Sequence, residues 1–205
     1  MYNTKLTSFN DKYVIESLQK GEVVAFPTET VYGLGCIYDD LGAFNKLVEV
    51  KKRPPDKPFT LMLGKDYDFS KYAYVDKDIQ RVIDKFVPGA ITLLLKPKEG
   101  LPYQVTLKSP SIGIRVSSNV KLQELIYNVG KPLLVPSANL SGEQPLTNAK
   151  DVYNKFKNQI PYIVDDVCLN AKPSTIVNLS NKGEIELVRQ GDISFDEIKK
   201  VFKGE

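Results

Sequence analysis

A short apolar run near the N-terminus constrains the fold of this chain more than any other feature. Val23 to Phe26 are all apolar, and Gly21 and Pro27 bound them. A continuous run of this length predicts a strand that is buried on both faces. Polar residues 28–30 (Thr-Glu-Thr) follow directly. Ligands often bind where buried strands end, so this edge is a candidate site.

Two glycines, Gly33 and Gly35, follow the polar residues and bracket Leu34. Because glycine has no Cβ, it lets backbone approach a ligand closely or adopt dihedral angles that other residues resist. The same pattern is also typical of a simple glycine-rich turn after a strand. The spacing alone leaves both interpretations open.

Two later segments repeat this combination of an apolar strand and polar residues. The run PLLVP (residues 132–136) is followed by Ser137, Ala138 and Asn139, and Ser174 and Thr175 precede another apolar run. The recurrence predicts a shared polar rim, although Ser-Ala-Asn is equally compatible with a turn or a helix N-cap.

Apolar spacing alternates between periods of 3.6 and 2 along the chain, which predicts one α/β domain around a twisted, mixed sheet. We expect it to span residues 1–205, with a core at about 10–195. Helices are predicted at 11–18, from 41 into the cations at 51–53 before Pro54, and at 79–86, 120–129, 149–156 and 193–202. Strands are predicted at 23–26, 59–63, 90–95, 111–116, 132–136, 160–164, 176–179 and 186–189.

Between two predicted strands, residues 96–110 are rich in turn-forming residues. Such a composition predicts a surface loop with some mobility. We therefore consider closure of this loop over a ligand as a hypothesis.

Four cations lie in the segment KKRPPDKP: Lys51, Lys52, Arg53 and Lys57. Cations near a helix C-terminus are favoured by the helix dipole and are commonly solvated. The prolines also stiffen this loop, which would hold the cations in place for a polyphosphate. Composition alone slightly favours the first interpretation.

The segment SIGIRV predicts a strand on which Gly113 and Arg115 share one face. An arginine beside a glycine can reach a ligand that lies over the sheet. An ion pair at a sheet edge is the commoner use of such an arginine.

Several function classes are excluded by what the sequence lacks. It contains no histidine, so a Ser-His-Asp triad and histidine metal ligands are absent. Neither GxxxxGK[ST] nor GxGxxG occurs. The net charge of +3 is too small to indicate nucleic-acid binding by itself. The two cysteines, Cys36 and Cys168, form no metal or disulfide motif, and no signal or membrane segment is apparent, so a cytoplasmic location is expected.

The ordered set of motifs resembles the YrdC/TsaC family of threonylcarbamoyl-AMP synthases. These motifs span residues 21–191 and comprise PTETVYGLG, KxR, PGAITLLLK, GIRV, PSANLSG with PLT, STIV and LVRQG. The resemblance implies an open, concave, mixed α/β sheet with a ligand-binding face. It also implies a nucleotidyltransferase that forms threonylcarbamoyl-AMP from L-threonine, bicarbonate and ATP, with release of pyrophosphate. Mg²⁺ would accompany the ATP.

The same resemblance implies roles for individual residues. Lys51 and Arg53 would be catalytic and, with Lys57, would hold the triphosphate. Contacts to ATP would come from Arg53, Lys57, Ser111, Asn139, Thr147 and Arg189. Threonine would be bound by Thr30, Arg115, Ser137 and Ser174, and Arg115 would pair with the carboxylate in bidentate fashion. No protein metal ligand is implied.

Further partners implied by the resemblance are tRNA and the downstream threonylcarbamoyl-transferase complex. Three features depart from the family pattern: Met62 where many relatives have histidine, Asn178 where aspartate is usual, and a chain end at Glu205 that leaves no room for a second domain. The alternatives are an RNA-binding protein of this fold and a paralogue without synthase activity.

Overall fold

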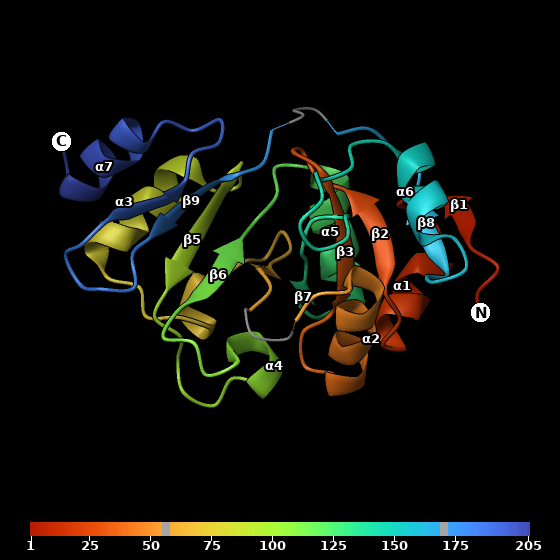
Figure 1. Ribbon diagram of the computed structural model, residues 1–205. Helices are drawn as coiled ribbons and strands as arrows, with labels where there is room; N and C mark the ends of the chain where they lie inside the picture. Colours follow the sequence, from red (N-terminus) through yellow and green to blue (C-terminus); the bar gives the residue numbers. More distant parts are fainter. Residues whose placement is uncertain (55–57, 169–171) are drawn as a thin grey trace.

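The computed structural model describes residues 1–54, 58–168 and 172–205. It contains a mixed sheet of ten strands in the order β1-β8-β2-β3-β7-β4-β6-β5-β9-β10 (Figure 1). The strands are β1 Lys5–Thr7, β2 Val24–Pro27, β3 Tyr32–Ile37, β4 Leu61–Met62, β5 Ile91–Leu95, β6 Ile112–Arg115, β7 Leu133–Leu134, β8 Tyr162–Val164, β9 Thr175–Asn178 and β10 Glu186–Arg189. The predicted α/β class with a twisted, open mixed sheet is confirmed.

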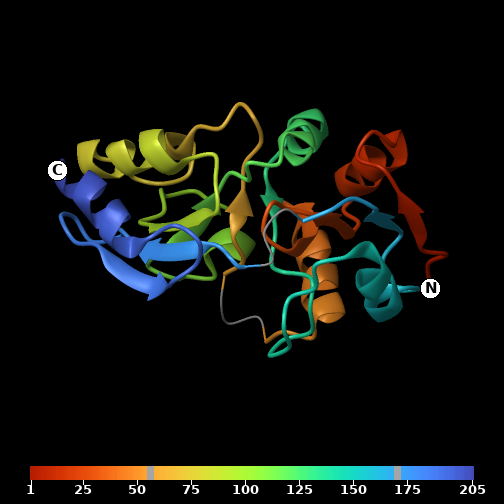
Figure 2. The ribbon, with the colours of Figure 1, turned by 90° about the horizontal axis from the view of Figure 1, so that it is seen from above.

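The helices are α1 Lys12–Gln19, α2 Leu41–Lys51, α3 Lys77–Phe86, α4 Tyr103–Thr106, α5 Val120–Val129, α6 Ala149–Phe156 and α7 Phe195–Lys203, with a 3-10 turn at Phe69–Lys71. Figure 2 shows α1, α3 and α5 along one side of the sheet and α2 and α6 on the other. Within the described residues, no helix has the length and apolar character that a membrane span requires.

Local capping explains why most predicted helices form where expected. The side chain of Asp11 caps α1, that of Asp40 caps α2 and that of Asn119 caps α5. Gly130 ends α5 in the left-handed conformation. These signals are local, so α5 and α6 have the predicted bounds.

The short strand β7 joins the two halves of the sheet. It pairs antiparallel with β3 on one side, where Cys36 lies opposite Leu134, and with β4 on the other, where Leu61 lies opposite the same residue. The β2–β3 hairpin belongs to the half with the N-terminus, whereas β4, β5 and β6 belong to the half with the C-terminus. The residues that directly follow β2 and β7 in the chain therefore lie beside residues from β5 and β6.

The glycine-rich segment after β2 is a buried strand, so its interpretation as a turn was wrong. All six residues of β3 are buried. A Cβ on Gly35 would lie 2.5 Å from Cε1 and Cζ of Phe26, and a Cβ on Gly33 would lie 2.6 Å from Cγ1 of Val135. These glycines leave room for neighbouring core side chains.

Gly35→Ala should destabilise the fold by about 1–3 kcal/mol, because its methyl group would overlap the buried Phe26 ring. The free energy of unfolding, measured by denaturant titration, tests this expectation. Phe26→Leu makes space at the same point, so the double variant should lose less than the sum of the single variants. Strictly additive losses would contradict steric overlap as the cause.

Residues 96–110, predicted to be a loop, contain the short helix α4. Gln104 and Val105 in this helix are buried, and Nε2 of Gln104 donates a hydrogen bond to the Tyr38 carbonyl at 3.1 Å. This packing was missed because four residues are too few for a helical period to be visible in the sequence. Closure of the segment stays a hypothesis.

Candidate functional site

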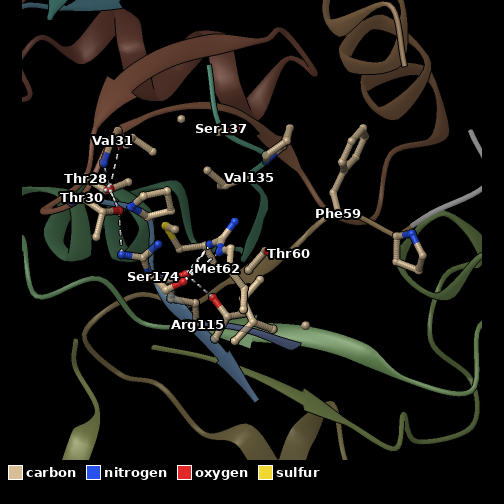
Figure 3. A pocket seen from close by; sticks show the side chains of 18 of the residues that line it. Thr28, Thr30, Val31, Phe59, Thr60, Met62, Arg115, Val135, Ser137 and Ser174 are labelled. Atoms are coloured by element: carbon tan, nitrogen blue, oxygen red, sulfur yellow. Dashed lines mark hydrogen bonds between the residues drawn. The ribbon is translucent and has the colours of Figure 1, made fainter. Parts of the chain in front are cut away.

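A cavity of about 510 Å³ opens between the two halves of the sheet (Figure 3). Residues from the β2–β3 turn form one side, and Phe59 lies across from Thr28 and Thr30. The predicted site residues that line it are Thr30, Arg53, Ser111, Arg115, Ser137, Ser174 and Arg189. The shared polar rim predicted from the recurring strand ends is thereby confirmed, and Gly33 and Ser137 form a β-bridge within it.

Arg115 lies on β6 and is 7% exposed. Its Nη2 donates to the Glu29 carboxylate at 2.7 Å and to Oγ1 of Thr30 at 3.0 Å. The other Glu29 oxygen accepts a hydrogen bond from the Ser117 hydroxyl. Gly113 lines the cavity two residues before Arg115, as alternation along the strand predicted. Glu29 and Ser117 are supporting residues that the predicted site did not include.

The β2–β3 turn is held by the hydroxyl of Thr28. This group accepts hydrogen bonds from the backbone N–H groups of Thr30 and Val31, and it lies 2.8 Å from the Val31 carbonyl and 2.9 Å from Oγ1 of Thr30. Such local side-chain bonding explains why a threonine directly after the strand makes a rigid turn. The turn thereby fixes the position of Thr30 beside Arg115.

Ser174 and Arg189 form another part of the wall. The guanidinium of Arg189 donates to the Ser174 carbonyl from Nε at 3.0 Å and from Nη2 at 2.9 Å. Oγ of Ser174 also lies 3.0 Å from Oγ1 of Thr92. Burial, and then the nearby Arg115 guanidinium, lower the pKa of Arg189 below its usual value. Two neighbouring cations in one cavity favour an anionic ligand.

Lys51 lies against the segment that carries Ser137 and is not among the residues that line the cavity. It is 3% exposed, and its Nζ donates to the carbonyl of Ser137 at 2.6 Å and to the carbonyl and side-chain oxygens of Asn139 at 3.1 and 3.0 Å. The Ser137 hydroxyl also donates to Oδ1 of Asn139 at 2.6 Å. Lys51 and Asn139 therefore support the segment that carries Ser137.

Burial, and then the Arg53 guanidinium, lower the pKa of Lys51 to about 8. The folded protein consequently gives up the Lys51 proton at lower pH than the unfolded chain, whose lysines titrate near 10.5. Burial of the charge costs stability below pH 8, and that cost disappears as the pH rises through 10.5. We expect the free energy of unfolding of the wild-type protein, relative to that of Lys51→Met, to increase by on the order of 1–3 kcal/mol between pH 8 and pH 10.5. Denaturant titrations of both proteins at several pH values test this, and a pH-independent difference would contradict it.

Two further predicted ATP contacts are not placed at this cavity by the described residues. Thr147 lines a different cavity together with Asp166 and Cys168, so its contact with a nucleotide stays a prediction. Lys57 lies outside the described residues.

Arg53 lines the cavity, and its guanidinium carbon lies 5.0 Å from the centre of the Phe59 ring. Phe59, Thr60, Met62 and Thr92 also line the cavity but were not among the predicted site residues. Met62 is the position at which many relatives have histidine, so the family pattern did point to it. Phe59, Thr60 and Thr92 carried no signal in the sequence, because β-strand partners distant in the chain bring their side chains to the site.

No carboxylate is among the described residues that line the cavity. In the described part of the chain, histidine, cysteine, aspartate and glutamate also form no group of three that could hold a metal ion. The walls therefore offer hydroxyl groups and guanidinium groups, a set that suits phosphates and carboxylates better than a bare cation.

The Sua5/YciO/YrdC family model, described as telomere recombination, matches residues 16–191. The chain belongs to this family. A threonylcarbamoyl-AMP synthase of Wigglesworthia glossinidia brevipalpis is 33% identical over 181 residues, which cover 87% of this chain and 92% of that protein. The uncharacterized protein YciO of Escherichia coli K12 is 30% identical over 179 residues, or 86% of each chain. The resemblance to this family is confirmed.

Solved structures of the Sua5/YciO/YrdC family share the fold. Sua5 of P. abyssi in complex with L-threonine matches with a TM-score of 0.88 and 28% identity. The match covers 98% of this chain and 60% of that one. E. coli YciO matches with a TM-score of 0.84 and 26% identity, over 95% of this chain and 98% of that one. This chain therefore spans about three fifths of the Sua5 chain and nearly all of YciO.

Proposed function

We propose that this member of the Sua5/YciO/YrdC family is a threonylcarbamoyl-AMP synthase, a nucleotidyltransferase that uses L-threonine, bicarbonate and ATP. One observation carries the proposal: a cavity of about 510 Å³ is lined by Arg53, Arg115 and Arg189 together with several hydroxyl groups. This composition suits substrates with a carboxylate and phosphates. The identity with a named synthase supports the same conclusion.

For threonine, we propose the part of the cavity around Thr30, Arg115 and Ser174. The guanidinium would pair with the carboxylate, and the hydroxyl groups would orient the rest of the amino acid. Nη2 of Arg115 already bonds to Glu29 and Thr30, so a bidentate contact that includes Nη2 would replace the bond to Thr30 and keep the ion pair with Glu29. The complex of P. abyssi Sua5 with L-threonine supports an amino-acid site in this fold.

For ATP, we propose contacts with Arg53, Ser111 and Arg189, while Ser137 stays among the residues proposed to bind threonine. Lys51 and Asn139 would act by holding the Ser137 segment. Mg²⁺ would enter as part of the ATP complex, since the described lining residues provide no carboxylate ligand.

The chemistry needs no histidine. Bicarbonate would convert the threonine amine to a carbamate with loss of water, and a carbamate oxygen would attack the α-phosphate while pyrophosphate leaves. The cavity would bring the reactants together and stabilise the developing negative charge through guanidinium groups. Transfer of the product to tRNA through a downstream complex is part of the same proposal.

Pyrophosphate release by the purified protein tests this function. Reactions would contain ATP, Mg²⁺ and bicarbonate, with threonine present, absent or replaced by serine. Release that depends on both threonine and bicarbonate supports synthesis, and the serine reaction measures amino-acid selectivity. Absence of release while ATP still binds would contradict the proposed function.

A second candidate is a paralogue without synthase activity, because the relatives that match this chain include YciO, which is uncharacterized. Such a protein would retain ligand binding and show no threonine-dependent release of pyrophosphate.

An RNA-binding role would be recognised by its salt dependence, because affinity through phosphate contacts decreases steeply as the salt concentration increases. A salt-titrated RNA binding assay separates this outcome from small-molecule binding.

A further inference from the structure

Glu29 lies directly beneath the cavity and has no role in the proposed chemistry. It is 3% exposed and is not among the residues that line the cavity, so a ligand would not reach its carboxylate. One carboxylate oxygen accepts from Nη2 of Arg115 at 2.7 Å, and the other accepts from the hydroxyl of Ser117, which is 1% exposed. Both Glu29 oxygens are therefore engaged from within the protein.

The hydrogen bonds of Arg115 show what this arrangement does to the guanidinium. An arginine side chain has five N–H donors, two of them on Nη2. Acceptors on Glu29 and Thr30 lie within hydrogen-bond distance of Nη2, enough to engage both of its donors. Nε is buried and has no hydrogen-bond partner among the described residues. The bonds to Glu29 and Thr30 therefore hold the Nη2 side of the group in place while the Arg115 side chain lines the cavity.

The positive charges of Arg115 and Arg189 also require Glu29 as a counter-ion. Arg189 is close enough for the Arg115 charge to lower its pKa, so the two guanidinium groups repel each other. A buried charge without a counter-ion is strongly unfavourable. Glu29 supplies that counter-ion when the cavity holds no anion, and it leaves the cavity face of Arg115 available.

We propose that Glu29 is a positioning residue for amino-acid binding: it fixes the Arg115 guanidinium so that Nη1 meets the carboxylate of the substrate. This inference rests on the proposed function, because it assumes that Arg115 binds an α-amino acid carboxylate. Glu29 acts through Arg115 and contacts neither ATP nor threonine. Its loss should therefore affect the two substrates differently.

The test compares Glu29→Gln with wild type in KM for threonine, KM for ATP and kcat, together with the Kd for L-threonine from calorimetry. Glutamine keeps the size of the side chain and removes its charge. We expect KM and Kd for threonine to increase by at least about tenfold, the effect of weakening a charge-assisted contact. KM for ATP should change by less than about threefold. A purely structural role would lower the amount of active protein without separating the two KM values.

Glu22→Gln is the matched control. Glu22 also accepts hydrogen bonds from a cation and a hydroxyl, those of Lys46 and Tyr2, but lies outside the cavity. We expect wild-type values for both substrates. Should Glu29→Gln fail to fold, Ser117→Ala removes one hydrogen bond from Glu29 and keeps the ion pair, and it should increase the Kd for threonine alone.

The outcomes separate the inference from the proposed function. Wild-type protein that binds threonine without releasing pyrophosphate contradicts the synthase function, while the Kd values still test Glu29. A threonine Kd for folded Glu29→Gln within twofold of wild type overturns the positioning role. Failure of the wild-type protein to bind threonine overturns both.

Discussion

Arg115→Ala is expected to reduce threonine-dependent pyrophosphate release by at least about 100-fold, because it removes the cation that would bind the threonine carboxylate. The same change should destabilise the fold by about 3–5 kcal/mol, since it leaves the Glu29 carboxylate buried without its counter-ion. Steady-state kinetics and denaturant titration measure the two effects.

The double variant Arg115→Ala with Glu29→Gln separates these effects. Removal of the unpaired Glu29 charge should restore much of the free energy of unfolding. Activity should stay low, because residue 115 then carries no guanidinium group. Recovery of activity along with stability would show that Arg115 supports the fold only. A normal rate for Arg115→Ala would contradict the site assignment directly.

Arg53→Ala is expected to reduce synthesis by at least about 30-fold with a loss of stability below about 1 kcal/mol. Its guanidinium lines the cavity and lies over the Phe59 ring, and from this position we propose that it contacts a phosphate of ATP. The effect should appear in KM for ATP and in kcat. Arg53→Lys keeps the charge and loses the planar fork, so an intermediate rate is expected.

Lys52→Gln is the matched control for Arg53. Lys52 is the neighbouring cation in the same basic segment, and it is exposed and does not line the cavity. A wild-type rate for this variant would show that Arg53 acts through its position and not through the general charge of the segment. Equal losses in both variants would contradict a specific role for Arg53.

Much of the architecture could be predicted from the sequence because the signals are local. Apolar periodicity and a capping residue defined α5 and α6, and alternation on β6 placed Gly113 and Arg115 on one face. The strand β3 was missed because its glycines are usually signs of a turn. Their purpose, space for Phe26 and Val135, is visible only in the packed core.

The candidate site was predicted less completely than the fold. The order of short motifs along the chain indicated the family and the cavity-lining hydroxyl and guanidinium groups, because each motif is a continuous stretch of sequence. The motifs did not show that Lys51 would lie against the segment that carries Ser137 or that Thr147 would line another cavity. Those positions depend on how separate loops pack together.

By itself, the sequence determined the α/β class, the ends of α5 and α6, and the residue types available for chemistry, since these depend on near neighbours in the chain. Only the tertiary structure decided which groups meet. Glu29 and Arg115 are 86 residues apart, and Lys51 and Asn139 are 88 apart. Burial then sets the energy of these contacts, because a charge removed from water must find a partner or change its pKa. Such pairings form because the order of the strands in the sheet brings together segments that are far apart in the chain.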